Sequence, residues 1–194
     1  MFDCIAAPEP LRARFRGQKL PAMLRTAAAL RLRPQWDLET RTTVTVLRTL
    51  ARRALTLAEE AAIHEKAILA TVRTMRPDLL EEKGVGPIVA ATLLCAWSHP
   101  GRIHSEAAFA MLAGVAPIPA TSGKTINRHR LNRHGDRQLN RALHTIALSR
   151  LRYDDRTRSY ADHSTTRGRS RRETIRCLKR YIARDLYRLL EHPA

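Results

Sequence analysis

Residues 38–75 read LETRTTVTVLRTLARRALTLAEEAAIHEKAILATVRTM, a long stretch that contains neither Gly nor Pro. Apolar residues recur in it at intervals of three, four and seven, close to the heptad seam of a coiled coil. The seam consists of Val46, Leu50, Ala54, Leu57, Ala61, Ile68 and Val72. We therefore predict one long helix that joins chains into a homo-oligomer through residues 46–72. The alternative is that this stripe packs against the rest of the same chain.

A glycine-containing turn follows the long helix. Pro77 ends that helix, and Gly84-Val85-Gly86 precedes an apolar helix that begins at Pro87 and runs to about Trp97. A Gly-x-Gly turn leaves backbone N–H groups free, and the helix N-terminus adds partial positive charge. The pattern predicts a helix-hairpin-helix-like element in which Gly84 and Gly86 hold a DNA phosphate. The alternative is an ordinary corner between two helices.

The rest of the chain favours further helices and no extended sheet. Helices are expected at about 105–113 with Ser105 as the N-cap, at about 136–152, and at about 171–191. Residues 114–135 are expected to form a long loop with two short strands, and the charged residues 153–170 are expected to be flexible. The predicted fold is mostly α: a long coiled-coil-like helix followed by a small helical domain.

The prolines and the helix pattern suggest three parts. Residues 1–37 are predicted to be irregular because prolines interrupt every candidate helix except one around residues 22–32. Residues 38–80 are predicted to be a coiled-coil or linker helix, and residues 81–194 a C-terminal domain. The opening of the chain reads like one entered midway, so we expect a remnant at the N-terminus.

The positive charge of the chain is large and local. The formal net charge is +17, from 35 Lys and Arg against 18 Asp and Glu. Between Lys124 and Arg180 there are 17 basic residues and 5 acidic ones, whereas residues 61–123 hold 5 of each. A GC-rich genome would explain the preference for Arg over Lys, but not the excess of positive charge. The distribution predicts a surface that binds a polyanion, with DNA as the partner.

A hydroxyl residue stands at the start of this basic region. The segment Pro119-Ala120-Thr121-Ser122-Gly123-Lys124-Thr125 places Ser122 before a glycine. Attack by serine on a phosphodiester needs activation and neutralised phosphate charge, and His129 and His134 are candidate acids or bases. The alternative is a common Ser-Gly turn. A nucleotide-binding phosphate loop is rejected because Ile118 stands where that motif needs glycine. The residues predicted to bind nucleic-acid phosphates are Lys124, Arg128, Arg130, Arg133, Arg137, Arg167, Arg169, Arg171 and Arg172.

Other residue types point to an intracellular protein without its own metal centre. Cys4, Cys95 and Cys177 are odd in number and far apart, which favours reduced thiols in the cytoplasm, and Cys95 lies in an apolar run typical of a core. No apolar stretch reaches 18 residues, so no membrane span is expected. No cluster of carboxylates suggests a metal site, and no cofactor is expected in this chain.

An ordered series of motifs resembles the DEDD-class insertion-sequence transposases of the IS110 group, which are bridge-RNA-guided recombinases. The matching motifs span roughly the last 110 residues, and residues 10–80 are similar to the linker and coiled coil of that family. The motifs are Gly84-Val85-Gly86-Pro87, Ser105-Glu106-Ala107-Ala108-Phe109-Ala110, Gly114-Val115, Pro117 to Thr125, Arg130-Leu131-Asn132-Arg133, Gly135-Asp136-Arg137 and Ile175 to Tyr181.

The resemblance implies an enzyme in two parts. A RuvC-like domain supplies four acidic residues that bind magnesium, and a helical C-terminal domain supplies a serine that becomes covalently linked to DNA. Ser122 matches that serine. Many relatives have Ser-Ser-Gly where this chain has Thr121 before Ser122, so Thr121 is the alternative nucleophile.

The resemblance also implies what this chain lacks and what it binds. No RuvC-like domain precedes residue 10, so we expect a C-terminal transposase portion that binds magnesium only with that domain and does not cleave DNA alone. The family assembles as an oligomer around a structured guide RNA, and a nucleoid-associated location is expected. Two alternatives are a non-enzymatic DNA- or RNA-binding module and a purely structural dimer.

Overall fold

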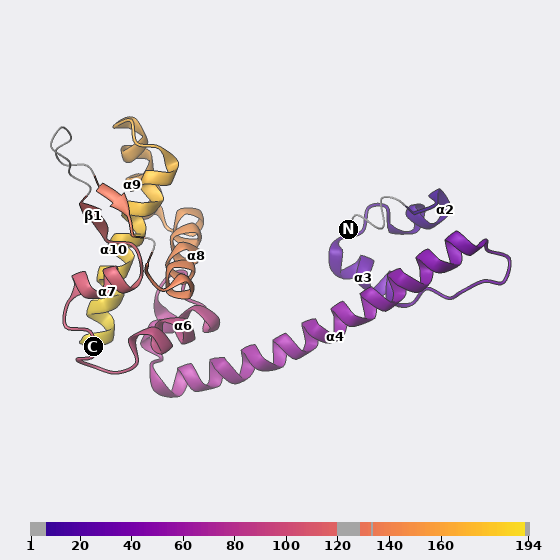
Figure 1. Cartoon of the computed structure of the whole chain (residues 1–194), viewed down its shortest axis with the longest axis horizontal. Helices are drawn as coiled ribbons and strands as arrows, with labels where there is room; N and C mark the ends of the chain where they lie inside the picture. The colour runs from indigo at the N-terminus through magenta and orange to yellow at the C-terminus, as the bar shows by residue number, and fades with distance from the viewer. Residues whose placement is uncertain (1–6, 120–128, 133, 193–194) are drawn as a thin grey trace. The chain divides into compact units, whose positions relative to one another are not determined.

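The computed structural model describes residues 7–119, 129–132 and 134–192, and Figure 1 traces the whole chain. The chain divides into two compact units, Met1–Lys66 and Ala67–Ala194, and the boundary falls inside one long helix. Each unit has its own hydrophobic core. The boundaries predicted at residues 37 and 80 follow sequence patterns and stay predictions.

The N-terminal unit is a small helical cluster on the first part of the long helix. It contains α2 (Glu9–Arg12), a 3-10 helix η1 (Ala13–Phe15), α3 (Leu20–Ala28) and the start of α4 (Leu38–Met75). Its core consists of Ala7, Leu11, Phe15, Ala27, Leu30, Val44, Leu47 and Ala51. The sequence predicts only one helix before residue 38, because proline usually interrupts a helix. Pro8 and Pro21 instead stand at the starts of α2 and α3, where a missing N–H costs nothing.

The long helix is confirmed from Leu38 to Met75. The face that packs in the N-terminal unit carries Val44, Leu47 and Ala51, which are spaced three and four residues apart. The predicted seam lies on a different face. Its members Val46, Leu50 and Leu57 are 45%, 48% and 53% exposed, whereas Val72 is buried in the second unit. The described part of the chain therefore leaves these three side chains of the seam exposed.

The second unit is a helical bundle with one short hairpin. Its elements are α5 (Asp78–Glu81), α6 (Pro87–Trp97), α7 (Glu106–Leu112), β1 (Pro117–Pro119), β2 (His129–Leu131), α8 (Arg137–Tyr153), α9 (Asp155–Thr166) and α10 (Arg171–Glu191). Helix α10 packs on α7, α8 and α9, and α6 packs on α8, as Figure 1 shows. The mostly α fold predicted from the sequence is confirmed.

Buried apolar side chains at helical spacing hold this bundle together. Leu139, Leu143 and Ile146 form one face of α8 and are completely buried. From α10, Leu178, Ile182, Leu186 and Leu190 close the same core. The spacing of these residues predicted both helices correctly.

Polar contacts fix the ends of the helices. Ser105 Oγ accepts a hydrogen bond from Ala108 N (3.1 Å), as predicted for an N-cap. Asp136 Oδ1 accepts from Gln138 N and Leu139 N at the start of α8. Ser170 and Glu173 form a capping box at the start of α10. These caps place the first turns of α8 and α10, on which the candidate site depends.

Two expectations for this unit were wrong. Residues 155–166 were expected to be flexible, but they form α9, because Asp154 caps the helix by accepting from Thr157 N (3.1 Å) and α9 packs on α8 and α10. Cys95 was expected in the core, but it is exposed. The buried face of α6 carries Ala90, Leu93, Leu94 and Trp97, and Cys95 falls outside that stripe.

Candidate nucleic-acid interface

The predicted nucleophile belongs to the loop of the β1–β2 hairpin. The strands pair antiparallel, with Pro117 opposite Leu131 and Pro119 opposite His129. Thr121, Ser122, Lys124 and Arg128 follow β1 and lie outside the described residues, as does Arg133. Arg130 pairs through its backbone with Ile118 in the register of the hairpin. The structure therefore positions the two ends of the loop that carries Ser122.

The chain segments that flank this hairpin line a pocket of about 510 Å³. Val115 stands two residues before β1, and Asn132 directly follows β2. The other walls come from the start of α8 and the first half of α10. Among the described residues, the lining consists of Gly114, Val115, Asn132, Gly135, Arg137, Asn140, Arg141, His144, Arg176 and Lys179.

Two glycines bring the pocket walls together. Gly114 has φ +66°, a left-handed conformation that favours glycine. A Cβ on Gly135 would lie 2.3 Å from Gly114 N and 2.4 Å from Gly114 Cα. The two backbones can pass at this distance only because both residues lack a side chain, and Asp136 N donates to Leu112 O (2.6 Å) beside them.

Two asparagine side chains hold the loop after α7 in place at the same wall of the pocket. Asn132 Nδ2 donates to Met111 O (2.9 Å), and Asn140 Nδ2 donates to Ala113 O (2.7 Å). Asn140 Oδ1 in turn accepts from Lys179 Nζ (2.5 Å) on α10. One amide thus joins the loop after α7 to both helices of the pocket.

The charge of the pocket is positive. Arg137, Arg141 and His144 lie four and three residues apart on α8, so they share one face, and Arg176 and Lys179 face them from α10. Burial lowers the pKa of Lys179, and the charge of Arg176 lowers it further. No carboxylate lines the pocket, so its charge and its size suit an anion.

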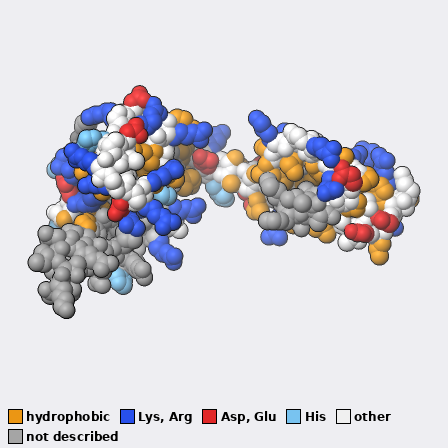
Figure 2. Space-filling view, turned by 90° about the horizontal axis from the view of Figure 1, so that it is seen from above, with side chains coloured by type: hydrophobic (Ala, Val, Ile, Leu, Met, Phe, Trp, Pro, Cys, Tyr) orange, Lys and Arg blue, Asp and Glu red, His pale blue; other side chains and the backbone are white. Residues whose placement is uncertain are grey.

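A second basic group lies where α9 meets α10. Arg167, Arg169, Arg171 and Arg172 are all exposed, and Gly168 turns the chain between the helices with φ +79°. The sequence predicted that this run orders on nucleic acid, yet the Ser170–Glu173 capping box already shapes its end. Figure 2 shows Lys and Arg side chains spread over unit 2, with few Asp and Glu among them.

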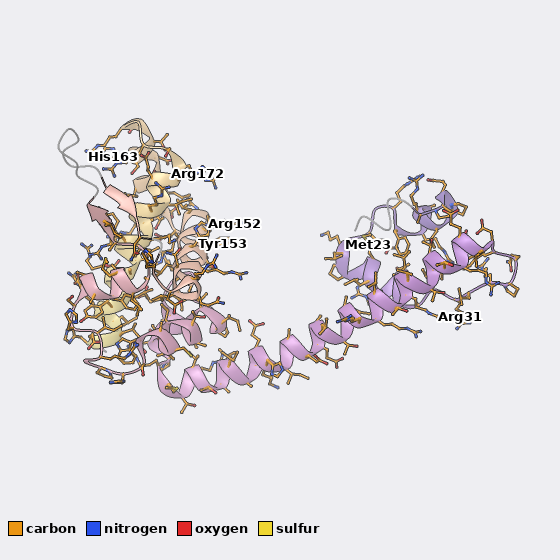
Figure 3. All side chains as sticks on the ribbon, viewed as in Figure 1. Met23, Arg31, Arg152, Tyr153, His163 and Arg172 are labelled. Carbon is orange, nitrogen blue, oxygen red and sulfur yellow. The ribbon has the colours of Figure 1, made fainter. Side chains whose placement is uncertain are left out.

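The two basic groups are continuous along α10. Arg172, Arg176 and Lys179 are four and three residues apart, which places them on one side of the helix. Figure 3 labels Arg172 at the beginning of this stripe. Of the residues predicted from sequence, Arg137 lies in the pocket, and Arg171 and Arg172 start the helix that forms its other wall.

Several residues of this surface escaped the sequence prediction. Asn140, Arg141, His144, Arg176 and Lys179 line the pocket, but they come from two helices that are distant in the chain. The spacing of Arg137 and Arg141 on a predicted helix is the one feature of the sequence that indicates a shared basic face.

An exposed aromatic ring also escaped prediction. Tyr153, at the end of α8, is 69% exposed, and the guanidinium of Arg152 lies 5.2 Å from its ring centroid (Figure 3). An exposed aromatic ring beside arginines can stack on an unpaired base.

The structure gives the Gly84-Val85-Gly86 turn a packing role. Gly84 has φ +85°, and a Cβ there would lie 3.1 Å from Ser149 Cβ and 3.2 Å from Ile146 O on α8. Gly86 precedes α6, and a Cβ on it would meet no atom within 4 Å. Close packing on α8 therefore accounts for the first glycine, and phosphate binding by Gly84 and Gly86 stays a prediction.

The described residues do not fit a metal centre. Within 7–119, 129–132 and 134–192, no three His, Cys, Asp or Glu side chains come together in a way that could hold a metal ion. None of the helices in this part of the chain is long and apolar enough to cross a membrane.

Comparison with known proteins relates the chain to a transposase family. Residues 77–162 match the model of the transposase IS116/IS110/IS902 family. The chain is 30% identical over 137 residues to the insertion element IS110 uncharacterized 43.6 kDa protein of Streptomyces coelicolor, covering 66% of this chain and 34% of that protein. It is 30% identical over 158 residues to the insertion element IS900 uncharacterized 42 kDa protein of Mycobacterium paratuberculosis, covering 77% of this chain and 40% of that protein. The matched segments thus cover 34% and 40% of the length of these relatives.

Proposed function

Because residues 77–162 belong to the IS116/IS110/IS902 transposase family, we propose that this chain acts in DNA transposition as a DNA-binding part of an insertion-sequence transposase. The observation that carries the proposal is the basic pocket beside the hairpin, which falls largely within the matched residues. DNA is the polyanion that such an enzyme handles. A cytoplasmic, nucleoid-associated location follows from the same proposal.

The second part of the proposal concerns Ser122. Its hydroxyl proton passes to a base, its Oγ bonds to a phosphorus of DNA, and the bond from that phosphorus to a deoxyribose oxygen breaks. The leaving oxygen takes up a proton, so the step needs neither oxidant nor reductant. The support is the Ser-Gly context in the segment between β1 and β2, the hairpin that starts beside the basic pocket at Val115 and Asn132. Lys124, Arg128, Arg130 and Arg133 supply positive charge along the same segment.

The chain does not cleave DNA by itself under this proposal. The described residues offer no metal-binding cluster, and the resemblance assigns magnesium to a RuvC-like domain. Cleavage therefore requires the chain to work together with such a domain. The function proposed for the residues of this chain is binding to DNA, or to a structured guide RNA.

A covalent adduct tests the role of Ser122. The chain is mixed with a full-length IS110-group transposase whose own serine is replaced, together with labelled DNA carrying the ends of its element. An adduct at the mass of this chain, 22.0 kDa plus DNA, is expected with the natural sequence and with Thr121→Val, and none with Ser122→Ala.

The remaining outcomes of this test separate the alternatives. Loss of the adduct with Thr121→Val, but not with Ser122→Ala, would show that Thr121 is the nucleophile. Absence of an adduct from all three proteins, with DNA binding intact, would favour the non-enzymatic nucleic-acid-binding module.

The exposed seam of α4 supports self-association. Val46, Leu50 and Leu57 form an apolar line on α4, and they are exposed in the part of the chain that the structure describes. Pairing with the same face of a second copy would bury these side chains, which is the usual driving force of a coiled coil. We include a homo-oligomer joined through residues 46–72 in the proposed function.

A further inference from the structure

We propose that the pocket between α8 and α10 holds one backbone phosphate of DNA, gripped by Arg141 and Arg176 from opposite helices and positioned by Lys179. This inference rests on the proposed function, because it takes DNA as the polyanion. It adds a specific binding site, built from side chains that no motif of the sequence singled out.

The basic side chains of the pocket have no ion-pair partner among the described residues. Arg137, Arg141, Arg176 and Lys179 line one pocket, and within the described part of the chain none of them makes an ion pair with a carboxylate. The nearest acids along the helices are committed elsewhere. Asp136 caps α8, and Glu173 accepts hydrogen bonds from Ser170 N (2.8 Å) and Oγ (2.7 Å) in the capping box of α10.

This arrangement raises the free energy of the empty pocket. Like charges in a half-enclosed site repel each other, and an anion bound among them removes that repulsion. Hydrogen bonding to Ser170 lowers the pKa of Glu173, to which the charge of Arg176 also contributes, so Glu173 stays ionised but faces its own cap. The pocket is therefore completed by an anion that comes from outside.

The position of Lys179 also favours an anion in this pocket. Its side chain is half-buried, and its ammonium donates to Asn140 Oδ1 (2.5 Å), while Asn140 is itself anchored to Ala113 O (2.7 Å). Burial of an ammonium without an anionic partner is costly. The amide anchor holds that ammonium at the pocket wall, where its remaining N–H groups can reach a ligand.

The chemistry of the ligand follows from the donors. Two guanidinium groups and an ammonium that line one pocket suit a tetrahedral oxyanion, since arginine donates to phosphate in a bidentate way. A pocket of about 510 Å³ exceeds what one phosphate fills, so it also admits the sugars on either side. Free inorganic phosphate shares the chemistry of the phosphate group but lacks those sugars. The hairpin that leads to Ser122 starts beside this pocket, at Val115 and Asn132, which favours a DNA strand as the source.

The test compares two double variants that remove equal charge. Arg141→Gln with Arg176→Gln empties the pocket of its guanidinium groups. Arg53→Gln with Arg73→Gln removes the same charge from exposed positions on α4. All four arginines are exposed, so both variants should fold, and the melting temperature of each is measured as a check. Arg141→Lys with Arg176→Lys serves as a milder pair that keeps the charge.

Binding to a labelled 30-base-pair duplex is followed by fluorescence anisotropy over a range of NaCl. The pocket variant should bind about tenfold more weakly than the α4 variant. The plot of the logarithm of its association constant against log[NaCl] should also be less steep by about 0.9, because one phosphate contact is lost. The Lys pair should lie between the natural chain and the Gln pair. Equal affinity and slope for the two Gln variants would overturn the proposal.

Inorganic phosphate provides an independent readout. Its titration into the natural chain should shift the imidazole proton resonances of His144, which lines the pocket, and the pocket variant should lose this shift. If phosphate shifts His144 but the natural chain binds no DNA, the anion pocket stands and the proposed function fails. If DNA binds but neither readout distinguishes the variants, DNA binding stands and the pocket proposal fails. If the pocket variant loses affinity for a single-stranded RNA but not for the DNA duplex, DNA is not the source of the phosphate and the proposal fails.

Discussion

Gly135 shows at the scale of a residue how tightly the wall of the basic pocket is built. A Cβ there would lie 2.3 Å from Gly114 N and 2.9 Å from Leu112 O, both backbone atoms that cannot rotate away. The loop after α7 and the segment before α8 would have to separate. Overpacking of this kind typically costs about 1–3 kcal/mol.

We therefore expect Gly135→Ala to lower the free energy of unfolding by at least about 2 kcal/mol, measured by urea denaturation. Gly86→Ala is the matched control. A Cβ on Gly86 meets no atom within 4 Å and its φ is −93°, so a change within about 0.5 kcal/mol is expected. Similar losses for both variants would show that the close approach at Gly135 is not what makes that glycine necessary.

The same scale shows which site residues can be predicted from sequence. Ser105 was found because a cap depends on its neighbours in the chain, and Ser105 does accept from Ala108 N. The pairing of Asn140 with Lys179 could not be found, since it depends on how α10 lies against α8. Ser122 and Lys124 were selected from the chain alone, and both lie outside the described residues.

At the scale of an element, the long helix α4 determines whether the chain associates with a second copy. Its two apolar stripes have different fates: Val44, Leu47 and Ala51 are buried in the N-terminal unit, and Leu50 and Leu57 remain exposed. An exposed leucine pair seven residues apart is typical of one side of a coiled coil.

We expect the natural chain to sediment as a dimer or larger oligomer, and Leu50→Asp with Leu57→Asp to sediment as a monomer. The reason is that paired seams would bring four carboxylates into an apolar contact. Thr49→Asp with Thr56→Asp adds the same charge to exposed neighbouring positions and should leave the oligomer intact. A natural chain that sediments as a monomer at every concentration would refute self-association through α4.

Prediction of the elements succeeded where one periodic stripe dominates. The ends of α4, α6 and α10 agree with the predicted helices because apolar periodicity, prolines and caps act together there. Helix α9 was missed because its sequence, DRTRSYADHSTT, has no apolar stripe. Its cap at Asp154 and its contacts with α8 and α10 hold it in place, and contacts of that kind are tertiary.

The distribution of charge matters most at the scale of the whole molecule. The excess of Lys and Arg after residue 124 becomes two basic groups in the second unit, joined along α10 by Arg172, Arg176 and Lys179. Sequence alone located the basic region. It could not show that part of the region lines a pocket, because α8 and α10 contribute charges that lie up to 42 positions apart, from Arg137 to Lys179.

The central claim is that this transposase-family chain binds DNA through that basic surface. The most direct measurement is the dissociation constant of the natural chain for a labelled duplex between 50 and 400 mM NaCl, a range of about one decade. We predict binding at low salt, and a slope of the logarithm of the association constant, 1/Kd, against log[NaCl] of about −2.7 or steeper, as expected for three or more neutralised phosphates. A flat salt dependence, or no binding even at the lowest salt, would contradict it.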